Sequence, residues 1–190
     1  MRLILASASP RRRELLARAG LEFEVRTSSL DETPMAGESP EEFARRAARD
    51  KALSVAAGAP QGSLVLGADT IVVTDHEILG KPVDASDAAR MLRMLSGITH
   101  RVITGVCLVR GPAHVEAIRH AITWVTFRRL DEQEIAEYVA SHEPFDKAGA
   151  YGIQGLASKF VTRIEGCYFN VVGLPVAMVY DLLKSLPDFP

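Results

Sequence analysis

The sequence predicts a mixed α/β protein, and two observations lead to that prediction. Short apolar runs typical of buried strands alternate along the chain with segments of helical periodicity, a pattern that favours an α/β fold. Two long β-type runs, residues 99–109 and 115–127, flank the turn residues Gly111 and Pro112, which predicts a hairpin. Because the strands of a hairpin are antiparallel, the sheet is expected to be mixed rather than purely parallel.

Each element has its own signal in the sequence. Apolar or β-branched runs predict strands at residues 3–6, 21–25, 64–68, 71–74, 99–109, 115–127 and 160–164. Periodic segments predict helices at residues 10–19, 40–57, 85–95, 131–140 and 175–186. Ser9 is expected to cap the first helix and Pro10 to take its first position, where the missing N–H costs nothing. Ser39 followed by Glu42, like Asp131 followed by Glu134, has the spacing of a capping box.

The overall composition narrows the classes of function. Of the 190 residues, 47% are hydrophobic and 24% charged, and without a repeat or linker one domain spanning residues 1–190 is expected. A formal net charge of −2 and 6% aromatic residues argue against a nucleic-acid partner. No apolar run has the length of a signal-peptide core or a membrane span. Cys107 and Cys167 lack the spacing of a zinc site or disulfide framework. We therefore expect a cytoplasmic protein with no membrane partner.

A block of positive charge stands at the start of the first predicted helix. Arg11, Arg12 and Arg13 follow Pro10 directly, although the helix dipole favours acidic residues in a first turn. One interpretation is a bound anion, because a strand–loop–helix start offers free N–H groups to a phosphate. A solvated basic turn is the alternative, and the stretch by itself leaves both open.

Other polar residues stand where the fold does not need them. Asp69 interrupts the apolar run LVLGADTIVV, so its carboxylate must bind a cation, accept hydrogen bonds or lie at a kink. A capping residue in a turn between two strands is the alternative. Lys51 by itself fits a solvated helix face, and Lys81 a loop. Carboxylates combined with lysine and arginine are the groups that bind a divalent cation and a polyphosphate.

Several other chemistries lack their signals. The sequence contains no GxSxG nucleophile elbow and no HExxH metal motif. A cysteine–histidine hydrolase would need its histidine nearby in space, which the sequence leaves open. The glycine-rich segment 143–155 is typical of a binding segment close to the backbone or of an ordered turn, and it lacks the GxGxxG order of a dinucleotide site.

Eight short motifs occur in a fixed order over nearly the whole chain. They are LASASPRR, LDET, AxxKA, GADT, GKP, SGxTHxVxTG, EPxDKAGAYGIQG and NVVGLP. In this combination the chain resembles the Maf family of nucleoside triphosphate pyrophosphatases, once known as septum-formation inhibitors. The resemblance implies an elongated mixed sheet flanked by helices, two lobes around a deep cleft, and a homodimer. It also implies that a nucleoside triphosphate and water give a monophosphate and pyrophosphate, with Mg²⁺, Mn²⁺ or Co²⁺ as cofactor.

The same resemblance implies roles for individual residues. Asp69 would serve as general base or metal ligand for the attacking water, and Glu32 would help to hold the metal. Lys51, Lys81 and Arg12 would stabilise the charge that develops on the phosphates. The implied substrate-binding residues are Ser7, Ser9, Arg11, Arg12, Thr70 and Gln154.

Three of these positions also indicate a branch of the family. Arg11, Thr70 and Gln154 are of the type found in the dTTP and UTP branch, whereas the branch that prefers 7-methyl-GTP tends to have Trp, Gln and Glu there. An amide such as that of Gln154 can match the adjacent O4 and N3–H of uracil or thymine, and this pattern rejects cytosine. The alternatives are a 7-methyl-GTP pyrophosphatase and a non-catalytic regulator of septum formation.

Overall fold

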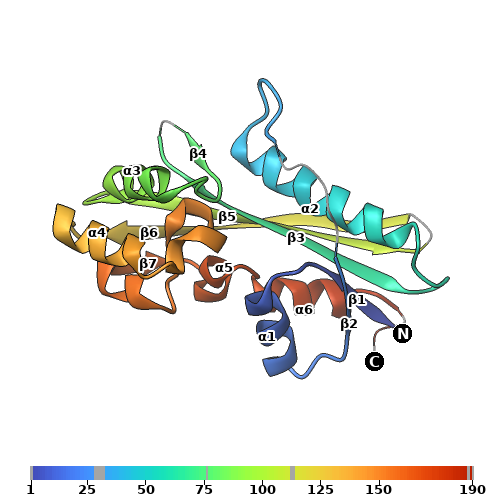
Figure 1. Cartoon of the computed structure of the whole chain (residues 1–190). Coiled ribbons are helices and arrows are strands. Elements are labelled where there is room, and N and C mark those ends of the chain that lie inside the picture. Colours follow the sequence, from blue (N-terminus) through green and yellow to red (C-terminus); the bar gives the residue numbers. More distant parts are fainter. Residues whose placement is uncertain (1, 28–32, 76, 112–113, 188, 190) are drawn as a thin grey trace. The chain divides into compact units, whose positions relative to one another are not determined.

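The computed structural model describes the chain except residues 1, 28–32, 76, 112–113, 188 and 190 (Figure 1). The strands are β1 (Leu3–Ala6), β2 (Glu24–Arg26), β3 (Leu64–Val73), β4 (Ile78–Leu79), β5 (Thr99–Arg110), β6 (His114–Phe127) and β7 (Val161–Glu165). The α-helices are α1 (Pro10–Arg18), α2 (Pro40–Ala56), α3 (Ala85–Leu95), α4 (Glu132–Ala140), α5 (Tyr168–Val172) and α6 (Val176–Lys184). Three short 3₁₀ helices are η1 (Glu143–Asp146), η2 (Ala148–Ala150) and η3 (Leu156–Phe160).

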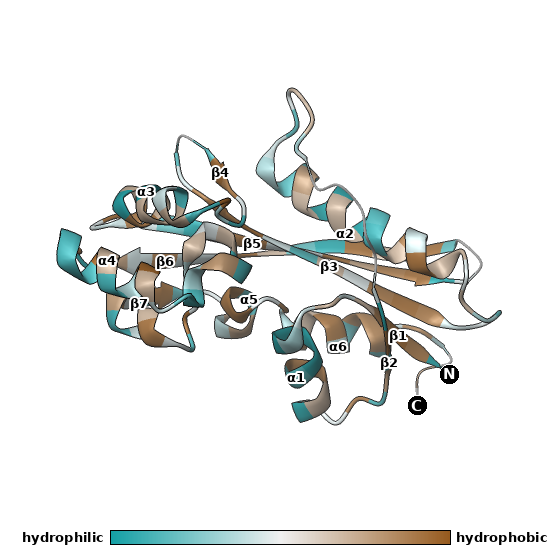
Figure 2. Ribbon diagram, in the orientation of Figure 1, coloured by the Kyte–Doolittle hydropathy of each residue, from teal (hydrophilic) through white to brown (hydrophobic). Residues whose placement is uncertain are grey.

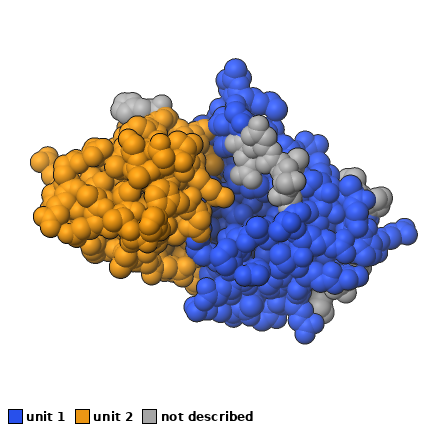
Figure 3. Space-filling model, viewed as in Figure 1, with its two compact units in different colours: residues 1–70, 104–121, 173–190 blue, residues 71–103, 122–172 orange. Residues whose placement is uncertain are grey.

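The strands form one seven-stranded mixed sheet, which confirms the predicted fold class. Its order is β2-β1-β3-β5-β6-β7, with β4 paired to β3. The chain divides into two compact units, drawn in different colours in Figure 3. Unit 1 comprises Met1–Thr70, Thr104–Ala121 and Gly173–Pro190, and unit 2 comprises Ile71–Ile103 and Ile122–Val172. Strands β3, β5 and β6 therefore each contribute residues to both units.

Unit 1 is built on parallel pairing. Strand β1 pairs in parallel with both β2 and β3. Helix α2 covers one face of these strands, and α1 and α6 lie on the other side (Figure 1). Apolar residues of the strands and of α2 pack together, and Figure 2 colours β1, β3 and parts of α2 as hydrophobic. This core consists of Ile4, Ala6, Ala48, Ala52, Val55, Ala56, Val65, Cys107 and Val109.

Helix α2 begins as its sequence predicts and lies unusually close to the sheet. Ser39 and Glu42 form the expected capping box. A methyl group at Gly67 of β3 would lie 2.1 Å from the carbonyl oxygen of Ala48, and one at Gly105 of β5 would lie 2.0 Å from that of Ala44. The two glycines therefore let the helix backbone rest directly on the strands.

Unit 2 combines antiparallel strands with an aromatic core. Val72 of β3 pairs with Leu79 of β4, and β6 pairs with β7. Helix α3 contacts α4 and the turns η1 and η2. The rings of His100, Phe127 and Tyr151 contact one another edge to face, an arrangement that aromatic pairs favour.

Four expectations about elements were wrong or incomplete. Residues 64–68 and 71–74 are not separate strands, because β3 runs unbroken through Asp69 and Thr70. The second strand starts three residues later than expected, since the N–H of Leu21 still bonds Leu16 and completes the end of α1. Helix α5 was not expected at all, and the last helix is shorter than expected.

The membrane and cysteine expectations can be compared with the described residues. None of the described helices is long and apolar enough to cross a bilayer. Cys107 and Cys167 are both free thiols. Burial raises the pKa of the Cys107 thiol to about 12, which keeps this side chain a neutral thiol in the core of unit 1.

Candidate active site

Unit 1 contains a buried ion pair. The ammonium group of Lys51, on α2, donates a hydrogen bond of 2.6 Å to Oδ1 of Asp69, on β3. The two side chains are only 11% and 7% exposed. Asp69 is therefore neither a turn residue nor at a kink, and its charge is compensated by Lys51 rather than by a break in the strand. Lys51 is likewise buried, so the solvated helix face that it would fit by itself is not its position.

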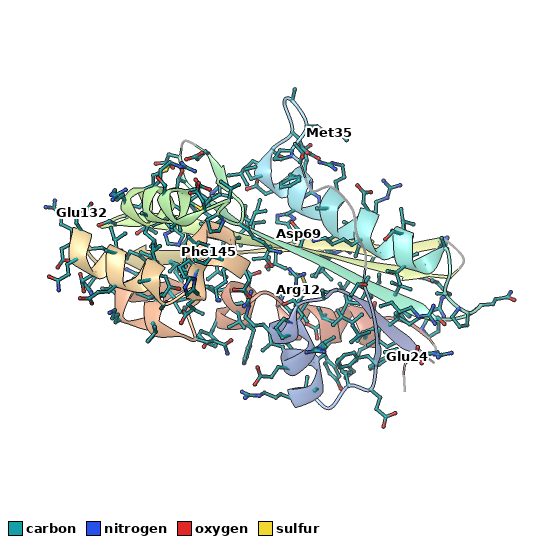
Figure 4. All side chains as sticks on the ribbon, viewed as in Figure 1. Arg12, Glu24, Met35, Asp69, Glu132 and Phe145 are labelled. Atoms are coloured by element: carbon teal, nitrogen blue, oxygen red, sulfur yellow. The ribbon has the colours of Figure 1, made fainter. Side chains whose placement is uncertain are left out.

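Arg12 joins three segments of unit 1 through its guanidinium group. Its Nε donates to the carbonyl of Gly173 at 2.8 Å. Nη1 donates to the carbonyl of Ala68 at 2.8 Å and to Ser7 Oγ at 3.2 Å, and Nη2 donates to Thr70 Oγ1 at 3.0 Å. The planar group thus connects α1 with β3 and with the segment that precedes α6 (Figure 4). This connecting role was not predicted from the sequence.

The start of α1 has the capping geometry that its sequence predicts. Ser9 Oγ accepts the N–H of Arg12 at 3.4 Å, and Pro10 occupies the first turn. Ser7 Oγ accepts the N–H of Ser9 at 3.2 Å. The first turn contains no acidic residue, so the positive end of the helix dipole and the neighbouring arginines act in the same sense on an anion.

The hydroxyl of Thr70 is bonded to protein on several sides. Besides Arg12, it bonds Thr104 Oγ1 at 2.9 Å and donates to the carbonyl of Gly173 at 3.3 Å. Thr104 is fully buried on β5. Neither Thr104 nor Gly173 was singled out from the sequence. The motifs VxTG and NVVGLP contain these two residues and were the available signal. A threonine in an apolar strand needs a hydrogen-bond partner for its hydroxyl when it is buried, so Thr104 could have been singled out.

Two predicted residues belong to unit 2. Lys81 is exposed and follows β4. Gln154 is exposed in a turn in which the N–H of Gly155 bonds the carbonyl of Gly152 at 3.1 Å. Both residues are therefore described as parts of unit 2. Arg11, in unit 1, is half-buried on α1.

Asp69 and Glu32 are the two predicted metal ligands. Glu32 lies outside the described residues, and within the described part of the chain no three His, Cys, Asp or Glu side chains are grouped as a metal site. Asp69 fits a hard cation, because Lys51 bonds Oδ1 and among the described residues Oδ2 accepts no hydrogen bond. A carboxylate oxygen of this kind, together with a few others, is what Mg²⁺ and similar ions bind.

Comparisons with known proteins show the family of the chain, and one solved structure shares its fold. The family model described as Maf-like protein matches residues 2–186. A protein of Koribacter versatilis named dTTP/UTP pyrophosphatase is 56% identical over 97% of this chain and 94% of its own length. A protein of Vibrio cholerae with the same name is 52% identical over 97% of both chains. The solved structure of a HAM1 protein from Coxiella burnetii shares the fold, with a TM-score of 0.51, 15% identity and coverage of 98% of this chain and all of that one. The chain belongs to the Maf-like protein family.

Proposed function

We propose that this chain is a metal-dependent nucleoside triphosphate pyrophosphatase that hydrolyses dTTP and UTP to the monophosphate and pyrophosphate. The observation that carries the proposal is the buried Asp69–Lys51 pair on the strand that Arg12 joins to the start of α1. A held carboxylate and a helix start able to bind phosphate are thus both part of unit 1. Relatives at 52–56% identity that are named dTTP/UTP pyrophosphatase support the same reaction.

The hydrolytic step needs a base close to the attacking water. Water attacks the α-phosphorus, the bond from that phosphorus to the oxygen bridging the α- and β-phosphates breaks, and pyrophosphate leaves with the electron pair of the broken bond. Because Lys51 bonds Oδ1 of Asp69, Oδ2 is the oxygen that takes the proton of the water or binds the cation. The hydrogen bond from Lys51 holds the carboxylate in one orientation, which either role requires.

The divalent cation is part of this proposal. Asp69 and Glu32 would hold it, and when bound it supplies positive charge that neutralises phosphate oxygens. The hydroxyl of Ser9 would bind a phosphate oxygen, and the positive end of the α1 dipole would attract the phosphates as well. Lys81 and Arg12 would add positive charge opposite the leaving pyrophosphate.

Base selection is assigned to Arg11, Thr70 and Gln154. The exposed amide of Gln154 offers one donor and one acceptor, which match O4 and N3–H of uracil or thymine. Thr70 would act mainly through its neighbours, because Arg12, Thr104 and Gly173 already bond its hydroxyl. Cytosine presents the donor and acceptor in exchanged positions and should be a poor substrate.

A substrate panel with separate detection of pyrophosphate and orthophosphate tests the proposal. UTP, dTTP, CTP and 7-methyl-GTP are incubated with the full chain and Mg²⁺, Mn²⁺ or Co²⁺, with EDTA as the metal-free control. Pyrophosphate from UTP and dTTP is expected, and it should disappear in EDTA and in Asp69→Asn. Asp181→Asn, an exposed aspartate on α6, is the matched control. Orthophosphate and a diphosphate as products would refute the assignment, as would preference for 7-methyl-GTP.

The assembly and the cellular location of the protein can be measured directly. We propose a homodimer that works in the cytoplasm and binds nucleotides rather than nucleic acid. Light scattering after size exclusion should give twice the mass of one chain, 20.7 kDa. Cell fractionation should place the chain with soluble cytoplasmic markers, and a gel-shift assay should show no binding to DNA or RNA.

A further inference from the structure

The turn that carries Gln154 is short and closed. The N–H of Gly155 bonds the carbonyl of Gly152 at 3.1 Å, so Gln154 is the third residue of a four-residue turn. Its side chain is exposed. A long exposed side chain loses rotational freedom when it binds a ligand, so discrimination by its amide depends on how firmly the backbone beneath it is held.

Two buried or partly buried side chains hold this turn at both ends. Tyr138 of α4 accepts the N–H of Gly152 at its hydroxyl oxygen, at 3.2 Å. The same hydroxyl donates to Oε1 of Glu143 at 2.9 Å, and Oε2 of Glu143 accepts the N–H of Leu156 at 3.0 Å. The carboxylate of Glu143 and the phenol of Tyr138 are thus hydrogen-bonded to each other, and together they bind the backbone N–H groups of Gly152 and Leu156, on either side of Gln154.

The supporting pair is itself firmly placed. The ring of Tyr138 is 2% exposed and packs edge to face on Phe160, with 5.3 Å between the ring centroids. Glu143 belongs to η1, the short helix that also contains Phe145, which Figure 4 labels. The backbone carbonyl of Glu143 accepts a hydrogen bond of 2.6 Å from Nζ of Lys147. A side chain fixed by packing and hydrogen bonds can position a neighbour precisely.

Positions 152 and 155 of the turn have no room for a side chain, which agrees with this arrangement. A methyl group at Gly155 would lie 2.2 Å from Oε1 of Glu143. A methyl group at Gly152 would lie 2.6 Å from the Lys147 side chain. Neither glycine has a positive φ, so space for Glu143 and Lys147, rather than backbone conformation, explains both residues.

We propose that Glu143 and Tyr138 are positioning residues for base selection: they hold the turn 152–155 so that the amide of Gln154 meets a uracil or thymine edge in one orientation. The proposal rests on the proposed function, in which Gln154 reads the base. It adds two residues that act through Gln154 and touch no substrate.

The experiment measures kcat/KM for UTP and for CTP in wild type, Glu143→Gln and Tyr138→Phe. Glu143→Gln keeps the size of the side chain but replaces one acceptor by a donor, and Tyr138→Phe keeps the ring while removing the hydroxyl. The ratio of the two kcat/KM values should fall on the order of tenfold in each variant, because a small displacement of a binding group is costly. Glu137 is an exposed glutamate on α4, next to Tyr138. As the matched control, Glu137→Gln should keep the wild-type ratio.

A second set of variants separates positioning from general structural support. In Glu143→Gln combined with Gln154→Ala the ratio should equal that of Gln154→Ala alone, because the support has nothing left to position. Amide hydrogen exchange at Gly152 and Leu156 should be faster in Glu143→Gln than in wild type. An unchanged ratio in Glu143→Gln and Tyr138→Phe, with a lowered ratio in Gln154→Ala, would overturn the positioning role and leave the proposed function standing. An unchanged ratio in Gln154→Ala would overturn both the base reading and the inference built on it.

Discussion

At the scale of single residues, the buried pair of Asp69 and Lys51 makes the strongest prediction. Asp69→Asn should lower kcat by about 10²–10⁴, the usual contribution of a positioned base, while circular dichroism shows an unchanged fold. A titration with Mg²⁺ tells the two roles of Asp69 apart. If Asp69 is only the base, the metal concentration that gives half of the maximal rate should be the same in Asp69→Asn as in wild type. If Asp69 is a metal ligand, that concentration should be higher in Asp69→Asn. Near wild-type kcat in Asp69→Asn would show that the pair is only structural.

Lys51 should matter more for stability than Asp69 does. Lys51→Met would leave the carboxylate of Asp69 buried without its cation, and breaking a buried pair in this way costs about 3–5 kcal/mol. Asp69→Asn still offers an amide oxygen to Lys51, so its loss should be smaller. Urea unfolding of both variants measures the difference. Equal losses, or a larger loss in Asp69→Asn, would mean that burial of the carboxylate is not what Lys51 compensates.

At the scale of elements, the close packing of α2 on the sheet places Lys51 opposite β3. Gly105→Ala would push a methyl group to within 2.0 Å of the carbonyl oxygen of Ala44, so the helix must move outward. Overpacking of this kind costs about 1–3 kcal/mol or more, and the free energy of unfolding from urea denaturation should fall accordingly. Gly58→Ala is the matched control, since nothing lies within 4 Å of that site. If both variants are equally stable, the helix does not depend on this contact.

The sequence predicted best those elements whose signals are local. The capping boxes at Ser39 and Asp131 have the expected hydrogen bonds, and α3 has the expected bounds. Such signals depend on residues three or four positions apart, so no tertiary information is needed. The strand β3 was split in the prediction because Asp69 looked incompatible with burial. Its partner Lys51 lies 18 positions away, and a single sequence does not show such pairing.

The candidate site follows the same division. The resemblance to the family indicated which residues to examine, but for Arg12 it implied only a role in binding the phosphates of the substrate. Arg12 also donates to the backbone carbonyls of Ala68 and Gly173. Because every residue type has such a carbonyl, the sequence does not show which residues accept these hydrogen bonds. Likewise, the pairing of Tyr138 with Glu143 joins a residue of the predicted helix 131–140 to one of the glycine-rich segment 143–155, and no signal in the sequence indicated it.

At the scale of the whole molecule, the chain passes repeatedly between its two units. Thr70, Thr104 and Gly173 each stand at an end of a unit 1 segment, and hydrogen bonds join Thr70 to the other two. Arg12 bonds Thr70 and Gly173 as well. One polar cluster thus fixes three segment ends of unit 1, and the same cluster includes the residue that follows Asp69.

The stability of the whole chain should depend on pH through a buried histidine of unit 2. His100 is 1% exposed, and burial lowers its pKa from 6.5 to about 4. Its Nε2 lies 2.9 Å from the hydroxyl of Tyr151, and the rings of Phe127 and Tyr151 pack against it. Within the described part of the chain no cation or carboxylate bonds this imidazole, so burial alone acts on it and the folded protein keeps it neutral.

The sign follows from proton binding in the two states. Between pH 6.5 and about 4 the unfolded chain protonates His100 while the folded chain does not, so the free energy of unfolding falls as the pH is lowered through this range. The full difference corresponds to about 3 kcal/mol. Urea denaturation of wild type and His100→Phe at pH 7.5 and pH 5 provides the measurement. His100→Phe should be less stable at pH 7.5, because Tyr151 loses a partner, yet lose less stability on going to pH 5. His120 also has a pKa lowered by burial and by Arg45, and it contributes equally to both proteins. The same loss in both proteins would show that His100 takes up its proton before the chain unfolds.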